Sequence, residues 1–454
     1  MATKSFSVSP DDIRDDFVPK ESYYKQDFAD LEAERLWPFI WQLACRMEEI
    51  PNVGDFVVYD IIDDSIIVVR TSASEIKAYH NVCPHRGRRL AEGTGNVKQF
   101  VCAFHGWRYN LAGKNIKVVD KGDWDGALRD EDICLTSVQC DTWGGFVFIN
   151  MDPKAEPLAD FLAPVPEYCD KFEFEKLRFR WYKTAVMPAN WKTVIGFFNE
   201  FYHVQQAHSQ LLEFTNDYSR SGGFGRHGQI WYDAEGAVPF KRSPRLPAME
   251  EPPLKSHIMQ FAEHYNRDIR SMLSERGYEV IQRLRDEVAD DAPADVVLTR
   301  WFELQIEAAN ADGAGWPAEL TPEYIEKSGL DWHVFPNTLY LHGLIDGVLW
   351  YRMRPNGTNP ESCIFDIWAL DRYGPDKQPP LNREFYENWR DGDWGLIFEQ
   401  DFNNVPEVQR GLRSRAFKGD RVNPVQERVI SNFHRTLRRF LKDPYDKPDI
   451  ERPR

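Results

Sequence analysis

The sequence predicts an α+β protein in which a small all-β domain is followed by a larger domain with an antiparallel sheet flanked by helices. Between residues 51 and 150, short runs of β-branched and aromatic residues are separated by Asp, Gly and Asn turns, which is typical of an all-β domain. After residue 178, similar runs alternate with longer stretches of helical periodicity. The chain of 454 residues, 42% hydrophobic and 14% aromatic, is long and apolar enough for two or three folded domains.

Residues 1–45 are predicted as a helical lead-in that belongs to the larger domain, and residues 46–160 as the all-β domain. The strands expected in the all-β domain are Asp55–Ile61, Ser65–Arg70, Ile76–Asn81, Gln99–Ala103 and Gly144–Asn150. A segment rich in Pro and acidic residues, 152–166, is expected to end this domain.

The larger domain is predicted over residues 161–442 and the disordered tail over 443–454. A variable insertion of about 210–330, helical near His257–Glu287, interrupts the domain. Its strands are expected at Arg178–Val186, Trp332–Leu341, Val348–Arg354 and Ser362–Leu370, and its last helices at Trp394–Leu412 and Pro424–Leu441.

Composition excludes several classes of function. The net charge of −16 argues against non-specific nucleic-acid binding, because a phosphate backbone needs a basic counter-surface. No apolar run reaches the eighteen or so residues of a membrane span, and the N-terminus has no hydrophobic signal core, so we expect a cytoplasmic protein that does not bind membranes. Seven cysteines without paired spacing fit a reducing compartment, where a special cysteine is a metal ligand or a nucleophile.

The stretch from Asn190 to His208 carries two histidines and an acid in an otherwise aromatic, helix-like run. Glu200 and His203 share a helix face and can touch. His203 and His208 would lie about 140° apart on a regular helix, so both reach one ion only across a widened or broken turn. The alternative is a pair of ordinary core histidines.

A second set of ligand types is formed by Cys83-Pro-His85 and Cys102-Ala-Phe-His105. Two short loops that each carry one thiolate and one imidazole can hold either a zinc ion or a Rieske [2Fe–2S] cluster. The other cysteines, Cys45, Cys134, Cys140, Cys169 and Cys363, have no ligand spacing and are expected to be structural.

The flanks of these loops, Cys83-Pro-His85-Arg-Gly and Cys102-Ala-Phe-His105-Gly-Trp-Arg-Tyr, resemble the Rieske signature of the non-haem iron ring-hydroxylating oxygenases, catalytic α subunit. The resemblance implies that Cys83 and Cys102 bind one iron of the [2Fe–2S] cluster and His85 and His105 the other. It also implies a helix-grip, START-like catalytic domain.

The stretch that begins with Asn190-Trp-Lys and ends with Glu200-Phe-Tyr-His203-Val-Gln-Gln-Ala-His208 resembles the catalytic helix of the same family. By this resemblance His203 and His208 bind a mononuclear iron(II), with a carboxylate from the C-terminal region as third ligand of a facial triad. We expect Asp401 in that role, with Glu399 and Glu407 as alternatives. Glu200 corresponds to the acid that bridges the iron to the cluster of a neighbouring subunit.

One departure from the family pattern is Ile195-Gly196, where an acid or amide pair is common. The glycine either enlarges the pocket or relieves helix packing. The pocket candidates are Gly196, Phe197, Phe201 and Val204, with Phe198 beside them, and the 210–330 insertion is expected to form a lid.

Seven basic residues and one acid, Glu92, surround the cluster loops: Arg86, Arg88, Arg89, Lys98, Arg108, Lys114 and Lys117. This local positive charge suits an acidic ferredoxin or reductase, although it is also typical of a solvated loop surface. The resemblance implies an oxygenase supplied by NAD(P)H through such partners, assembled as a homotrimer or as α3β3 with a β subunit.

Its expected reaction is O2-dependent cis-dihydroxylation of an aromatic or other apolar substrate. The alternatives are a Rieske monooxygenase, either an O- or N-demethylase or a hydroxylase, and more distantly an electron carrier with a ligand-binding domain.

Overall fold

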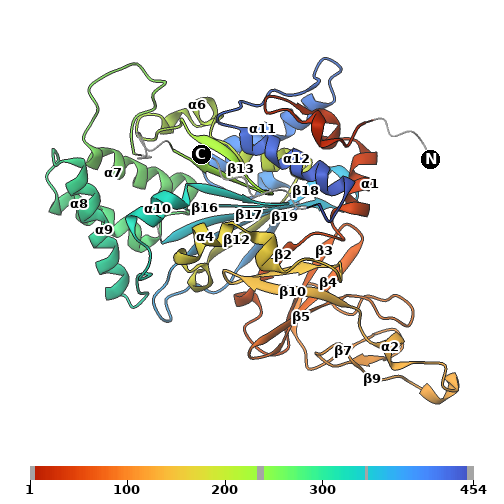
Figure 1. Cartoon of the computed structure of the whole chain (residues 1–454). Coiled ribbons are helices and arrows are strands. Elements are labelled where there is room, and N and C mark those ends of the chain that lie inside the picture. Colours follow the sequence, from red (N-terminus) through yellow and green to blue (C-terminus); the bar gives the residue numbers. More distant parts are fainter. Residues whose placement is uncertain (1–5, 233–239, 343–345, 447–454) are drawn as a thin grey trace. The chain divides into compact units, whose positions relative to one another are not determined.

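The computed structural model describes residues 6–232, 240–342 and 346–446 and divides the chain into two compact units (Figure 1). One unit comprises residues 30–161, and the other comprises residues 1–29 together with 162–454. Residues 447–454 of the predicted tail lie outside the described part. Among the described residues, no helix is long and apolar enough to cross a membrane.

The unit of residues 30–161 is built on an antiparallel sheet with the strand order β2-β11-β10-β5-β4-β3-β6. Its strands are β2 (Gln42–Arg46), β3 (Asp55–Ile61), β4 (Asp64–Ser72), β5 (Glu75–His80), β6 (Thr94–Asn96), β10 (Ser137–Trp143) and β11 (Phe146–Asn150). A smaller sheet contains β7 (Phe100–Val101), β8 (Arg108–Tyr109) and β9 (Asn115–Lys117). The short helix α2 (Asp130–Ile133) lies in this unit, and α3 (Leu158–Leu162) spans its C-terminal boundary in the chain. Strand β10 has no counterpart among the predicted strands, because most of its side chains are polar or exposed.

The other unit contains an eight-stranded sheet with the order β13-β14-β15-β16-β17-β18-β12-β19. The strands are β12 (Arg178–Met187), β13 (Arg220–Phe224), β14 (His227–Trp231), β15 (Asp331–Val334), β16 (Thr338–His342), β17 (Gly347–Asn356), β18 (Asn359–Asp371) and β19 (Arg383–Tyr386). Every pair is antiparallel except the edge pair β12–β19. The predicted α+β class with an antiparallel sheet is confirmed.

Helices cover one face of this sheet, as Figure 1 shows for α11 (Leu396–Leu412) and α12 (Arg428–Lys442). Helix α5 (Trp191–Phe198) lies on the same face, because Phe198 packs against Tyr351 of β17 and Phe365 of β18 with ring centroids 4.9 and 5.2 Å apart. Elsewhere in the unit are α4 (Val165–Cys169), α10 (Pro322–Ser328) and the short pair β1 (Val18–Pro19) with β20 (Gly419–Asp420); α1 (Gln26–Arg35) spans the boundary between the units in the chain.

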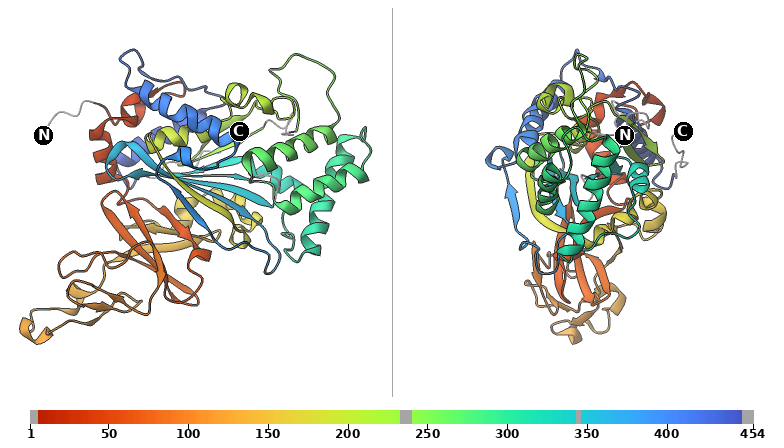
Figure 2. Two further views of the ribbon diagram at one scale, coloured as in Figure 1. Left: turned by 180° about the vertical axis from the view of Figure 1, so that it is seen from behind. Right: turned by 90° about the vertical axis from the view of Figure 1, so that its left-hand side faces the viewer.

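The predicted insertion contains three helices that pack together, α7 (Leu254–His264), α8 (Glu275–Glu287) and α9 (Ala294–Ala311) (Figure 2). The apolar positions of α8 recur at helical spacing, since Val280, Ile281 and Leu284 are buried against Val297 and Leu304 of α9. Helical structure predicted near His257–Glu287 is therefore present, interrupted after His264 by a π-helical turn at Tyr265–Ile269.

Two predictions about strands were incomplete. The expected single strand Trp332–Leu341 is two strands, β15 and β16, joined by a turn at Phe335-Pro336. Strands β13 and β14 were missed because their sequence is rich in glycine, which is depleted in strands. At Gly228 a side chain is impossible without a shift, since a Cβ atom would lie 2.1 Å from Cγ2 of Val429 on α12.

Candidate active site

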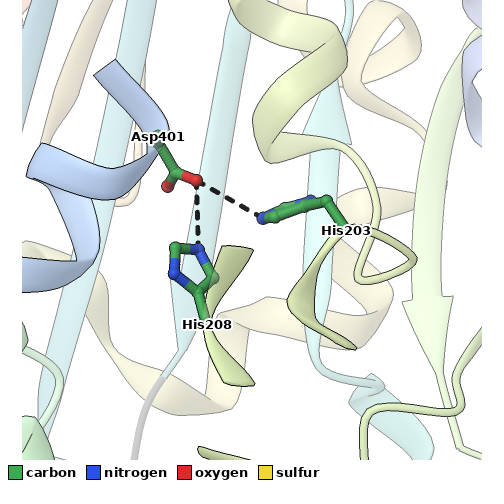
Figure 3. A group of neighbouring side chains, drawn as sticks. All are labelled: His203, His208 and Asp401. Carbon is green, nitrogen blue, oxygen red and sulfur yellow. Dashed lines mark ion pairs between the residues drawn. The ribbon is translucent and has the colours of Figure 1, made fainter. Parts of the chain in front are cut away.

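Three predicted ligands, His203, His208 and Asp401, come together in the larger unit (Figure 3). Oδ1 of Asp401 lies 3.0 Å from Nε2 of His208 and 3.5 Å from Nε2 of His203. Among the described residues, this is the one group in which three such ligand atoms all lie within 4.8 Å of one another. His208 and Asp401 are buried, and His203 is partly exposed.

The chain brings the two histidines together by breaking the helix between them. Helix α5 is capped at its start by the Asn190 side chain, which accepts a hydrogen bond from the Lys192 amide, and it ends at Phe198. A new short helix, α6 (Val204–Ala207), begins only after His203, and His208 follows its last residue. The predicted broken turn is present, and it lets both imidazoles face one point.

Each imidazole is held through its other ring nitrogen. Nδ1 of His203 lies 2.6 Å from Oε1 of Glu200, and Nδ1 of His208 lies 2.8 Å from Oε1 of Gln400. These contacts fix the ring orientation, as outer partners of metal-binding histidines do. Burial lowers the pKa of His203, but the charge of Glu200 and its hydrogen bond outweigh burial and raise the pKa to about 9.

The arrangement fits a single metal ion. Two ligand atoms about 2.1 Å from one ion and at right angles to each other lie about 3.0 Å apart, close to the separations found here. Oδ1 of Asp401 is buried and lies within ion-pair distance of both imidazoles, but it has no hydrogen-bond partner among the described residues. Two imidazoles and one carboxylate on one side of an ion form the set typical of non-haem iron(II).

The alternative carboxylates on α11 point elsewhere. Glu399 is exposed, and Glu407 is exposed and paired with Arg410 at 3.0 Å. Asp401 is 3% exposed and faces the histidines. The geometry favours Asp401 over both alternatives as the third ligand.

The cluster candidates lie in two loops of the smaller unit that have the same backbone structure. In one loop the amide of Cys83 donates to the Arg88 carbonyl, and the amide of Gly87 donates to the Cys83 carbonyl. In the other loop Cys102 and Gly106 repeat these bonds, with Trp107 as the acceptor for Cys102. Both glycines have positive φ, 75° and 73°, a conformation that side chains rarely adopt.

The four cluster candidates face one another. The rings of His85 and His105 have centroids 4.6 Å apart, and both Nδ1 atoms are buried without a hydrogen-bond partner among the described residues. Sγ of Cys83 lies 3.1 Å from the Tyr109 hydroxyl. Two thiolates and two imidazoles, one of each from each loop, form the mixed ligand set of a Rieske [2Fe–2S] cluster.

A cavity of about 500 Å³ extends from the His203, His208 and Asp401 group. Its walls are mainly aromatic and aliphatic and include the predicted residues Phe197, Phe198, Phe201 and Val204. Gly196, which was also expected there, is not among the described residues that line the cavity. A Cβ atom there would meet no atom within 4 Å, so helix packing does not require the glycine either.

Sequence reasoning missed two polar residues of the site. Gln400, which holds His208, directly precedes the predicted ligand Asp401, and its signal was only its place beside that ligand. Asp331, a buried acid in the cavity wall, opens the apolar strand β15. An acid at the start of an otherwise buried strand was the available signal.

Two family profiles match the chain. The profile described as "Ring hydroxylating alpha subunit (catalytic domain)" matches residues 174–443, and the profile described as "Rieske [2Fe-2S] domain" matches residues 40–123. Because the first match spans more than half of this chain, the chain belongs to the family of ring-hydroxylating oxygenase alpha subunits. The two domains imply a Rieske cluster and a mononuclear iron, and they replace the zinc interpretation of the cysteine and histidine loops.

Similar proteins include both monooxygenases and dioxygenases. The carnitine monooxygenase oxygenase subunit of Escherichia coli K12 is 35% identical over 201 residues, 42% of this chain and 52% of that protein. The biphenyl dioxygenase subunit alpha of Metapseudomonas furukawaii is 24% identical over 433 residues, 88% of this chain and 81% of that protein. The chain spans about half of the length of the first relatives it matches.

The fold is similar to that of the quaternary ammonium Rieske monooxygenase CntA in its crystal structure with L-carnitine. The TM-score is 0.63 at 17% identity, and the match covers 96% of this chain and 99% of that chain. At this identity the likeness shows the fold alone.

Proposed function

We propose that this chain is the oxygenase subunit of a Rieske monooxygenase that hydroxylates an organic ammonium compound at a carbon beside the nitrogen, so that the C–N bond is then cleaved. The observation that carries the proposal is the cavity beside His203, His208 and Asp401. Its described walls are mainly aromatic and aliphatic and contain acids, but neither Lys nor Arg. A positively charged group is thus more compatible with this cavity than an anion.

The relatives with 30% or more identity support the same choice, because their names describe carnitine and glycine betaine monooxygenases. This favours the alternative reaction from the sequence analysis over cis-dihydroxylation. The substrate differs from the aromatic compound expected there.

In this proposal His203, His208 and Asp401 hold the mononuclear iron, and Cys83, His85, Cys102 and His105 hold the cluster. When bound, the two centres supply electrons and activate dioxygen. One oxygen atom enters the product, and the other leaves as water with two electrons and two protons. Glu200 keeps a proton on Nδ1 of His203 and so leaves Nε2 free for the metal.

The aromatic walls exclude water from the reacting carbon.

We also propose that a ferredoxin or a reductase docks on the basic residues beside the cluster loops. Arg86, Arg88 and Lys98 are exposed, and Arg89 is half exposed in an ion pair with Asp60 at 3.3 Å. Complementary charge of this kind mainly increases the rate of encounter. A trimer, with Glu200 bridging to a neighbouring cluster, is part of the same proposal.

A second candidate is cis-dihydroxylation of an aromatic hydrocarbon. Two observations favour it: the long alignment with the biphenyl dioxygenase subunit and the large share of apolar residues in the cavity wall. It does not account for the buried acids.

A single turnover of the reduced protein under ¹⁸O2 tests the proposal. The panel contains choline, benzyltrimethylammonium, L-carnitine, glycine betaine, biphenyl and naphthalene. We expect a shortened amine together with an aldehyde that carries one ¹⁸O atom, provided that borohydride reduces the aldehyde before its oxygen exchanges with water. A dihydrodiol with two ¹⁸O atoms from a hydrocarbon, and no product from the ammonium compounds, would refute the monooxygenase assignment.

A further inference from the structure

Asp331 is a carboxylate in the sheet wall of the cavity and is only 3% exposed. It pairs across the sheet with Leu341 of β16, which pairs with Leu349 of β17. All three residues line the cavity and therefore share one sheet face. Oδ2 of Asp331 is buried and has no hydrogen-bond partner among the described residues.

We propose that Asp331 binds the cationic nitrogen of the substrate and makes the enzyme select organic cations that carry no carboxylate. The inference deepens the proposed function and rests on it for the class of substrate. A buried carboxylate without a partner destabilises the folded protein. Such a carboxylate in a cavity wall is therefore a candidate for binding a ligand.

Aromatic rings share the cavity wall with this carboxylate. Tyr232, Tyr265 and Tyr351 line the same cavity as Asp331, and burial is the main reason that the pKa of each phenol is raised. Phe261 stacks on Tyr265 with ring centroids 3.7 Å apart. Aromatic faces attract ammonium groups, most strongly where water is excluded.

The other acids of the cavity wall are already engaged or exposed. Asp217 is paired with Arg245 and accepts a hydrogen bond from Ser243 at 2.5 Å. Glu200 and Asp401 belong to the iron site, and Glu326 is exposed. Asp331 is thus the buried acid of the described wall that lacks a counter-charge.

The same charges disfavour zwitterions. Carnitine and glycine betaine each carry a carboxylate beside the ammonium group, and that carboxylate would enter a wall with acids and no described Lys or Arg. Choline and benzyltrimethylammonium present only the cation. The geometry therefore points to a substrate preference different from that named for the relatives.

Binding of matched pairs of ligands tests the inference without turnover. Choline is compared with its neutral isostere 3,3-dimethylbutan-1-ol, and benzyltrimethylammonium with neopentylbenzene, by calorimetry on the anaerobic holoenzyme. We expect each cation to bind at least about tenfold more tightly than its isostere, and choline at least about tenfold more tightly than carnitine. Asp331→Asn should reduce the two cation-to-isostere affinity ratios to nearly one and leave the affinity for the isosteres unchanged.

Glu326→Gln is the matched control, because it removes one negative charge from the exposed part of the same wall. This variant should keep both cation-to-isostere affinity ratios. An unchanged visible spectrum of the cluster and unchanged circular dichroism show that each variant is folded. Equal binding of cation and isostere by the unmodified enzyme, or a preference that survives in Asp331→Asn, would overturn the inference. A preference that depends on Asp331, together with doubly labelled dihydrodiols in the ¹⁸O2 experiment, would reject the proposed reaction and retain the cation site.

Discussion

Replacing Asp401 with alanine tests the iron site most directly. The change removes one of three ligand atoms that face a common point, with separations of 3.0 and 3.5 Å from the two imidazole nitrogens. No other described acid of α11 can take its place, because Glu399 lies two residues earlier, about 160° around the helix, and Glu407 is exposed. We expect iron to fall from about three to about two atoms per chain, because the cluster holds the other two.

Iron analysis of purified protein, with the visible and electron paramagnetic resonance spectra of the cluster, provides the assay. The cluster spectrum should be unchanged and turnover should be lost. Glu399→Ala and Glu407→Ala are matched controls on the same helix and should retain about three iron atoms and full activity. An Asp401→Ala protein with three iron atoms and normal turnover would refute the assignment of the triad.

Three further outcomes follow from the structure. Glu200→Gln should keep both metals and slow reoxidation of the reduced cluster in stopped-flow measurements, because its carboxylate holds His203; an unchanged rate contradicts a bridging role. Burial raises the pKa of Asp331 well above its usual range. The free energy of unfolding is therefore highest below the unfolded pKa of about 4, where the carboxyl is protonated in both states, and it falls as the pH rises toward the folded pKa. In the absence of substrate, Asp331→Asn should therefore raise Tm by ~1–3 °C at pH 8 and by less at pH 5; an equal shift at both pH values contradicts the reasoning. Reduction by the partner protein should slow as salt rises from 50 to 300 mM, and a salt-independent rate removes the docking proposal.

The predictable parts of the site were those whose ligands are close in sequence. Cys83 with His85, and Cys102 with His105, are local pairs, and the spacing of His203 and His208 even indicated the break in the helix. Asp401 follows His208 by almost two hundred residues, so no local pattern links them, and only the resemblance selected it among three acids. The structure supports that choice through burial and distance.

The parts that could not be predicted depend on long-range packing. Strands β13 and β14 contain glycines because α12 lies directly on them, a requirement invisible in their own segment. Asp331 faces a cavity built from several elements distant in sequence, including Phe261 and Tyr265 beyond α6 and Leu349 on β17. Its local sequence, Asp-Trp-His-Val, indicated only a strand.

The proposed metal ligands lie on or beside helices, whereas the proposed substrate-binding acid lies on a strand of the sheet. His203 and His208 lie on either side of the short helix α6, after the break that follows α5, and Asp401 lies on α11. Asp331 stands on β15, which is hydrogen-bonded to strands on both sides and cannot move independently of the sheet. Substitutions on this wall can therefore change which substrate is held without displacing the metal ligands, and relatives with the same iron chemistry can differ in the charge of the compound they accept.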